Sequence, residues 1–460
     1  MEGGILASPR IGNGVNYRML KYITILIKRS YAYSAIGVAV LAMFSLPHAS
    51  FITEGFGKLA PISQVTSDGE LSVALFPFRR VSVTGGSGAI GSQLHRTLER
   101  VPHVKSISVL SRPSGKNTRI SGSEKVEVVQ GDLLDIEALK KLVESGEVIF
   151  HLGGWSNIGP KPKIEEIFAT NVLSTAVLSQ LAQSHQRKFI FASTTFVYNL
   201  GTQRPDTTIS EDSFHLRPEL EPWVRTSQDE FSRLANQIAM GSLTFADSLP
   251  MISEFLEKTP IPLPTDANLY ALSKLIAERL VVQTQGMVFR FSNVYGPGDD
   301  SDRAVPKFFK QMTEAKEPKE FKFVPGRENA YIFVGDVVDA LIRGARLIGD
   351  LPEGISPIFT ISYPVNISQG DLFKRLNELT GGKHRIIPLS QEEMAELSLS
   401  VPPPIVFDTS KMTELLGLSV ETLTDIRTGL DFTQRWLFEP EKTKWTSFTR
   451  WISQSPETSL

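Results

Sequence analysis

Short apolar runs alternate with amphipathic stretches along the middle of the chain. Runs rich in Val, Ile and Phe occupy residues 81–84, 106–110, 126–132, 147–153, 188–198 and 286–292. Between some of them, residues 164–180 and 268–281 carry apolar side chains at helical spacing. Strands that alternate with helices favour a parallel sheet covered on both faces, so the pattern predicts a doubly wound α/β fold.

The first apolar run breaks into a glycine turn, Thr84-Gly-Gly-Ser-Gly-Ala-Ile-Gly91. The three-residue spacing of Gly85, Gly88 and Gly91 lets the backbone turn sharply, approach a pyrophosphate and pack the next helix on its strand. A surface turn could carry the same glycines, but the alternating elements that follow favour a Rossmann-like dinucleotide site. Ala89 and Ile90 belong to the same turn, whose helix N-terminus would face the phosphates.

The end of the second strand bears on the choice of cofactor. About 20 residues after the glycines, where an NAD enzyme keeps an acid, the chain has Ser111 and Arg112. An arginine without a nearby carboxylate suits a 2′-phosphate, so we favour NADP over NAD. The alternative is an arginine that points to solvent.

Two further patterns carry candidate chemistry. The run at 188–198 passes through the hydroxyls Ser193, Thr194 and Thr195, which either satisfy their own strand end or face a ligand. Tyr270 and Lys274 are four residues apart and therefore share one helix face. Such a pair also occurs by chance in many helices.

Together these motifs resemble the extended short-chain dehydrogenase/reductases, and among them the NAD-dependent epimerase/dehydratase family. The resemblance covers residues 79–437. It is carried by the glycine turn, Gly131-Asp132, His151-Leu-Gly-Gly154, Asn171-Val172, the hydroxyls before Val197-Tyr198, Tyr270-x-x-x-Lys274, Arg290-x-x-Asn293-Val-Tyr-Gly-Pro-Gly298 and Tyr331-Ile-Phe-Val-Gly-Asp336.

The resemblance implies a catalytic set. Tyr270 would be the general acid/base, and Lys274 would favour its phenolate and hold the nicotinamide ribose. Thr194 matches the residue that hydrogen-bonds the substrate oxygen, and Asn171 matches the asparagine that supports the site. The remaining implied contacts are Asp132 and Leu133 beside adenine, Gly153 and Gly154 near the cofactor, and Thr195, Asn293 and Arg327 towards the substrate.

Two departures from the family bear on substrate recognition. Nucleotide-sugar members usually have an arginine two residues before the aromatic that corresponds to Tyr331, whereas this chain has Asn329 there and Arg327 two residues earlier. The segment between Tyr198 and Tyr270 is also longer than is common in the family.

The leading functional hypothesis is a nicotinamide-dependent enzyme that oxidises a hydroxyl of a sugar, with a nucleotide-linked sugar favoured, to a transient ketone and then epimerises, dehydrates or reduces it. One alternative is a dehydrogenase or reductase of an apolar alcohol or ketone, similar to the 3β-hydroxysteroid dehydrogenases, whose motifs resemble Gly296-Pro-Gly-Asp299 and Val334-Gly-Asp-Val337. The other is a non-catalytic NADP-binding protein, which the presence of Thr194, Tyr270 and Lys274 disfavours.

Composition limits other functions. A net charge of -2 gives no electrostatic case for nucleic acid, and the absence of cysteine excludes disulfides and thiolate metal sites. Only seven histidines are present, so we expect no metal site. The length of 460 residues suggests several parts. We expect an N-terminal extension at 1–78, an NAD(P)-binding domain at 79–300 with an insertion at 199–265, a smaller substrate-binding subdomain at 301–440, and a tail at 441–460.

The N-terminal extension has its own pattern. Five basic residues precede Ser30, no charged residue occurs from 30 to 53, and residues 35–44 are apolar or small. This arrangement favours a targeting or interfacial segment, with membrane association through residues 30–51. The expected location is therefore cytoplasmic or membrane-associated, and a homodimer is a further expectation.

Overall fold

The computed structural model describes residues 76–113, 119–156, 161–202, 208–262, 269–351, 355, 357–401 and 403–439. All of them belong to one compact unit, residues 59–460. The predicted targeting segment and the tail at 441–460 lie outside the described residues. Within the described ranges, no helix combines the length and the apolar character needed to cross a bilayer.

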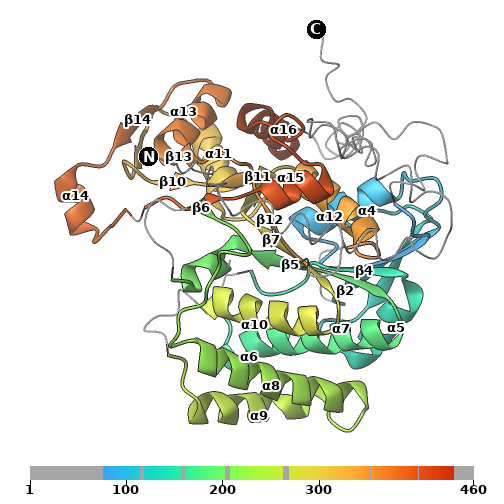
Figure 1. Ribbon diagram of the computed structural model, residues 1–460. Helices are drawn as coiled ribbons and strands as arrows, with labels where there is room; N and C mark the ends of the chain where they lie inside the picture. Colours follow the sequence, from blue (N-terminus) through green and yellow to red (C-terminus); the bar gives the residue numbers. More distant parts are fainter. Residues whose placement is uncertain are drawn as a thin grey trace, which may run out of the picture. The chain divides into compact units, whose positions relative to one another are not determined.

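A seven-stranded parallel sheet forms the centre of the protein (Figure 1). Its strands, in spatial order, are β12 (Ile358–Ile361), β7 (Met287–Phe291), β5 (Lys188–Thr194), β4 (Val148–His151), β1 (Arg80–Thr84), β2 (Ser106–Ser111) and β3 (Val126–Gln130). The order reverses between β1 and β4, and ligands bind in this fold at the carboxyl ends of the strands beside such a reversal. The predicted Rossmann-like fold is confirmed.

Helices cover both faces of this sheet, which explains why its central strands are continuously apolar. On one face lie α4 (Ala89–Leu98), α12 (Val334–Leu347) and α15 (Ser410–Leu416). On the other lie α5 (Ile136–Ser145), α7 (Ser174–Ser184) and α10 (Leu269–Gln283).

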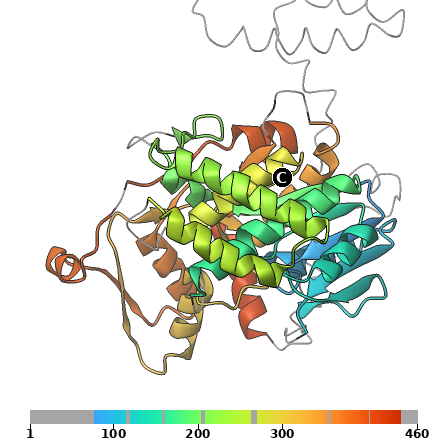
Figure 2. The ribbon, with the colours of Figure 1, turned by 90° about the horizontal axis from the view of Figure 1, so that it is seen from below.

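The insertion forms an additional layer of helices outside α7 and α10 (Figures 1 and 2). Its two long helices are α8 (Glu221–Ala239) and α9 (Phe245–Lys258). The Thr244 hydroxyl accepts a hydrogen bond from the Asp247 amide at 3.1 Å and so caps α9. Much of the predicted insertion is therefore helical. It packs on the helices that cover the sheet.

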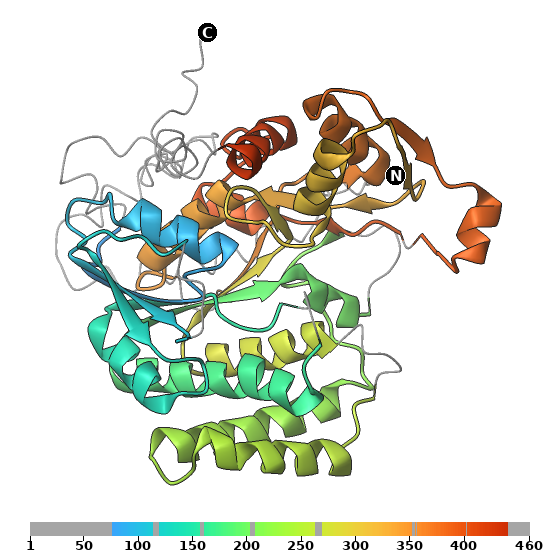
Figure 3. The same ribbon diagram turned by 180° about the vertical axis from the view of Figure 1, so that it is seen from behind.

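The C-terminal part builds a second apolar core around Phe309, Phe373 and Leu430. Its elements are β8 (Asn293–Tyr295), α11 (Ala304–Glu314), β9 (Glu320–Phe323), β10 (Glu328–Asn329), β11 (Tyr331–Phe333), β13 (Ile367–Ser368), α13 (Gln369–Leu379), β14 (Arg385–Pro388) and α16 (Ile426–Phe438). The short helix α14 (Gln391–Glu396) projects from it (Figure 3). Three elements within 301–440, namely α12, β12 and α15, return to the main sheet.

Candidate active site

The glycine turn stands where β1 meets α4, at the reversal of strand order. Gly85 has a φ of +69°, and its carbonyl accepts a hydrogen bond from the Gly88 amide at 3.0 Å. A Cβ on Gly91 would lie 2.3 Å from the Gly85 carbonyl oxygen, and one on Gly85 would lie 2.7 Å from the Gly153 nitrogen. Only hydrogen fits at these two positions. No side chain caps the first turn of α4, so its amides can take a phosphate.

Tyr270 stands near the start of α10, beside the carboxyl end of β5. Its phenol lies beside the Thr194 side chain, and its ring meets Trp155 and Phe196 edge-on at centroid distances of 6.1 and 6.3 Å. Burial raises the pKa of Tyr270, while the charge of Arg303 and the Thr194 hydrogen bond act in the opposite direction. The two predicted catalytic hydroxyls are therefore adjacent.

Lys274 lies one turn further along α10 and faces the loop after β4. Its ammonium donates to the Ala192 carbonyl at 2.9 Å and lies 4.5 Å from the centroid of the Phe191 ring. A Cβ on Gly154 would lie 3.7 Å from Nζ. Burial lowers the pKa of Lys274 to about 8, while Glu278 acts in the opposite direction.

Asn171 fixes the same loop from the opposite side. It lies in a π-helical turn, Ala169–Leu173, a distortion that is frequent at functional sites. Its amide accepts from the Trp155 nitrogen at 2.7 Å and donates to the Trp155 carbonyl at 3.1 Å and to the Ser273 hydroxyl at 3.0 Å. The side chain thus ties the loop to the helix that carries Lys274.

A buried ion pair joins α10 to two strands beneath this site. Glu278 and Arg290, whose side chains are 1% and 3% exposed, approach to 2.7 Å. Ser193 donates to Glu278 at 2.5 Å, which fixes the strand end next to Thr194. Sequence reasoning missed Glu278, although it follows Lys274 by four residues on the same helix face.

The predicted adenosine contacts lie at the ends of β2 and β3. Ser111 is buried, whereas Arg112 is exposed and no hydrogen bond or ion pair engages it among the described residues. The carboxylate of Asp132 accepts from the Leu134 amide at 2.8 Å and so shapes its own turn. Leu133 is a neighbour of the Gly153 loop, since a Cβ on Gly153 would lie 3.3 Å from its Cδ1.

The predicted substrate contacts are less closely grouped. Thr195 is buried at the start of a short 3-10 helix, Thr195–Leu200. The Asn293 amide donates to the Ala330 carbonyl at 2.8 Å and is thereby engaged with backbone. Arg327 is exposed, and its charge partly offsets the effect of burial, which raises the pKa of Tyr331 to about 12.

Two arginines near the site were not found from the sequence. Arg303 precedes α11, influences Tyr270 and lies 3.8 Å from Asp299. Arg119 forms an ion pair with Asp300 and donates to the Ser87 carbonyl of the glycine turn at 3.5 Å. Both are single residues in loops, where no periodic pattern marks them.

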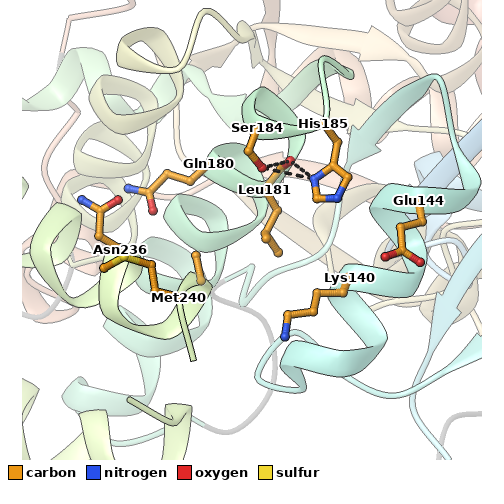
Figure 4. A pocket seen from close by; sticks show the side chains of 9 residues that line it. Lys140, Glu144, Gln180, Leu181, Ser184, His185, Asn236 and Met240 are labelled. Carbon is orange, nitrogen blue, oxygen red and sulfur yellow. Dashed lines mark hydrogen bonds between the residues drawn. The ribbon is translucent and has the colours of Figure 1, made fainter. Parts of the chain in front are cut away.

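A cavity of about 460 Å³ lies elsewhere, between α5, α7 and α8 (Figure 4). It is lined by Lys140, Glu144, Gln180, Leu181, Ser184, His185, Asn236, Ala239 and Met240. The C-terminal ends of α5 and α7, which line it, lead into β4 and β5, so the cavity lies towards the amino ends of the strands. It contains none of the predicted site residues.

These features define a dinucleotide-dependent oxidoreductase of the short-chain type. The NAD dependent epimerase/dehydratase family matches the chain over residues 81–222 and 234–352, which is more than half of its length. The protein belongs to this family and is an enzyme of the extended short-chain dehydrogenase/reductase class.

Several relatives have named activities. The uronate dehydrogenase of Pseudomonas syringae pv. tomato is 31% identical over 138 residues, which cover 30% of this chain and 46% of that enzyme. The UDP-N-acetyl-alpha-D-glucosaminuronate decarboxylase of Bacillus cytotoxicus is 23% identical over 79% of this chain and 99% of its own length. The 3 beta-hydroxysteroid dehydrogenase/Delta 5-->4-isomerase of Mycobacterium tuberculosis is 24% identical over 60% of this chain and 62% of its own.

Solved structures share the fold. The epimerase Mth375 of Methanothermobacter thermautotrophicus superposes with a TM-score of 0.57 at 19% identity, covering 82% of this chain and 96% of its own. MoeE5 in complex with UDP-glucuronic acid and NAD superposes with a TM-score of 0.53 at 20% sequence identity, and the match covers 80% of this chain and 99% of MoeE5.

Proposed function

We propose that this enzyme oxidises a hydroxyl of a sugar to a ketone and then epimerises, dehydrates or reduces the product. The observation that carries the proposal is that the Tyr270 phenol lies beside the Thr194 side chain, with Lys274 one helical turn away and its ammonium next to Gly154. In this proposal Tyr270 is the proton acceptor, Thr194 is the hydroxyl that orients the substrate, and Lys274 is the supporting cation.

The glycine turn and the open first turn of α4 fit a nicotinamide dinucleotide, which supplies the hydride acceptor when it is bound. Tyr270 would take the proton of the reacting hydroxyl, while Thr194 would orient the substrate oxygen. A phenol gives up its proton more readily beside positive charge. Both Lys274 and Arg303 supply such charge, and Arg303 is the cation that lowers the pKa of Tyr270 in the free enzyme.

The sugar substrate is supported by the relatives. Uronate dehydrogenase and the glucosaminuronate decarboxylase are both named for sugar acids, and MoeE5 was solved with UDP-glucuronic acid. We propose a sugar acid or a nucleotide-linked sugar as the substrate class. Arg327 remains our proposed contact for an anionic group, although Asn329 occupies the position at which a nucleotide-sugar enzyme usually has its arginine.

NADP is our proposed cofactor. Arg112 is exposed at the end of β2, without an ion-pair partner among the described residues, and could therefore meet a 2′-phosphate. MoeE5 was solved with NAD, so the preference is a property to be measured on this chain. Titration calorimetry with NAD and NADP tests it directly, and tighter binding of NAD would refute the proposal.

A second candidate is the oxidation or reduction of an apolar alcohol or ketone. It is favoured by the aromatic surroundings of Tyr270, where Phe196 is 45% exposed and Trp155 is partly exposed. The steroid dehydrogenase relative agrees with this alternative.

The decisive experiment incubates the enzyme with free uronates, UDP-sugars, dTDP-glucose and 3β-hydroxysterols, and follows both the absorbance of reduced cofactor and the products by chromatography, because epimerisation or dehydration returns the hydride and leaves no net reduced cofactor. Turnover of a sugar that is abolished in Tyr270→Phe supports the proposal. Tyr363→Phe, which removes a partly buried phenol from the C-terminal part, is the matched control and should keep its activity. Turnover of sterols alone would favour the second candidate. Sugar turnover that is unchanged in Tyr270→Phe would refute the assigned acid/base.

A further inference from the structure

A chain of buried hydrogen bonds crosses the reversal of strand order and passes through His151. The Gly153 amide donates to the Thr84 hydroxyl at 2.9 Å, and that hydroxyl lies 2.7 Å from His151 Nδ1. On the other side of the ring, His151 Nε2 lies 2.8 Å from the Thr175 hydroxyl, which donates to the Asn171 carbonyl at 2.8 Å. The three side chains in this chain are fully buried.

The direction of every bond in the chain follows from the number of protons. The single hydroxyl proton of Thr175 is given to the Asn171 carbonyl, so Thr175 can only accept from His151, and Nε2 must carry a hydrogen. In a neutral imidazole, Nδ1 is then an acceptor. It takes the hydroxyl proton of Thr84, which leaves a Thr84 lone pair for the Gly153 amide. All donors and acceptors are satisfied in one arrangement.

The ring is also held in the neutral form by its surroundings. Burial, together with the charge of Lys274, lowers the pKa of His151 to about 3. The His151 ring stacks on Phe191 at a centroid distance of 5.5 Å, and Lys274 lies over the same Phe191 ring. A protonated His151 would therefore oppose the charge that the site needs on Lys274.

We propose that His151 is a positioning residue that fixes the loop 153–155 at both of its ends. At one end, Thr84 holds the Gly153 amide. At the other, the Asn171 side chain holds the nitrogen and carbonyl of Trp155. Because both anchors join at one imidazole, a change at either hydroxyl should disturb the whole loop, next to which Lys274 lies and the dinucleotide would bind.

The test is a double-mutant cycle on the two hydroxyls, read out as cofactor affinity. Thr84→Val and Thr175→Val each remove one hydroxyl, and with it two bonds of the chain, with little change in shape, and each should weaken dinucleotide binding about tenfold, the order of effect that a lost buried hydrogen bond has. The double variant should bind no more than about twofold more weakly than either single variant, because the chain is already broken. A loss of cofactor affinity of about a hundredfold in the double variant, the product of the two single losses, would overturn the proposal.

Thr433→Val is the matched control. Thr433 is also fully buried in a helix and donates to the carbonyl four residues earlier, at 2.7 Å, but lies in α16. It should lose a comparable amount of stability and no cofactor affinity. Equal losses of affinity in Thr433→Val and Thr175→Val would assign the effect to general destabilisation and reject the positioning role.

An independent measurement needs no variant to bind cofactor. Long-range proton–nitrogen NMR of the folded enzyme, with the His151 signals identified by their loss in His151→Gln, should show hydrogen on Nε2 alone, unchanged from pH 5 to 9. Hydrogen on Nδ1, or titration within that range, would overturn the inference. The inference rests on dinucleotide binding and not on the proposed sugar substrate. Dissociation constants for the dinucleotide, measured without substrate, therefore test the role of His151 independently of the proposed function.

Discussion

Replacing Lys274 with methionine should separate stability from catalysis. The side chain is 6% exposed, so its charge lies in the interior, where it contacts the Ala192 carbonyl and the Phe191 ring. Methionine has a similar length and can occupy the same apolar channel without a charge. We therefore expect Lys274→Met to remain folded while it loses the cation that we propose to support Tyr270.

The magnitude follows from the pKa of Lys274. Burial lowers this pKa from 10.5 to about 8, and at 1.36 kcal/mol per pKa unit the charged form costs the folded state roughly 3 kcal/mol below pH 8. Methionine removes this cost but leaves the Ala192 carbonyl without its donor, at about 1–3 kcal/mol. The variant should thus be as stable as the wild type at pH 6, or more stable by up to about 2 kcal/mol.

The assay is urea unfolding at pH 6, 8 and 10. Because the folded pKa of Lys274 lies below the unfolded one, the unfolded chain binds more protons between about pH 8 and 10.5. The unfolding free energy of the wild type should therefore increase with pH across that window. The methionine variant should lack this increase, and the difference in unfolding free energy between the variant and the wild type should shrink as pH rises.

Lys411→Met is the matched control. Its ammonium also donates to a carbonyl, that of Ile358 at 2.7 Å, and lies 4.7 Å from the centroid of the Phe359 ring, while burial lowers its pKa. This variant should behave similarly in unfolding and keep its turnover. The reasoning would be refuted if Lys274→Met were several kcal/mol less stable than the wild type at pH 6, or if both proteins showed the same slope above pH 8.

Four further outcomes are expected. Gly91→Ala places a Cβ 2.3 Å from the Gly85 carbonyl oxygen, so dinucleotide binding in calorimetry should fall by at least about tenfold, and undiminished affinity would contradict the turn geometry. Arg112→Asp should shift the ratio of NADP to NAD affinity towards NAD. Tyr270→Phe should lower kcat by about a hundredfold or more with cofactor affinity nearly intact. Burial raises the pKa of Asp336 to about 7, so the protonated carboxyl contributes to stability at pH 4 and this contribution is lost as pH rises through 7. Asp336→Asn should remove this pH dependence of the unfolding free energy, as measured in denaturant titrations.

The strands of the main sheet could be predicted because their signal is local. Residues 81–84, 106–110 and 188–194 are buried on both faces, and a continuous apolar run is all that such a strand requires. The edge strand β12 was not predicted. It follows helix α12 and joins the sheet through pairing with β7, a contact of long sequence separation that leaves no periodic pattern in the sequence.

The candidate site likewise contains residues whose proximity could be predicted from the sequence and residues whose proximity could not. Tyr270 and Lys274 share a helix face, and Thr194 ends a strand, so their proximity follows from topology. Arg303 reaches the site only because α11 packs in the C-terminal core. The hydrogen bond of Asn293 to the Ala330 carbonyl depends on the pairing of β8 with β11, which spans many residues of unrelated sequence.

The layer formed by α8 and α9 limits how far this enzyme could be shortened. Helix α10 is apolar on nearly every side, with eleven of its residues buried, because α8 lies on the face that the sheet does not cover. Shortening residues 221–258 to the length of a more compact relative would expose that face and create an apolar surface prone to aggregation. The inserted hairpin, remote from the glycine turn, is therefore part of the scaffold that keeps Tyr270 and Lys274 in register, and a minimal engineered version would have to redesign the exterior of α10 first.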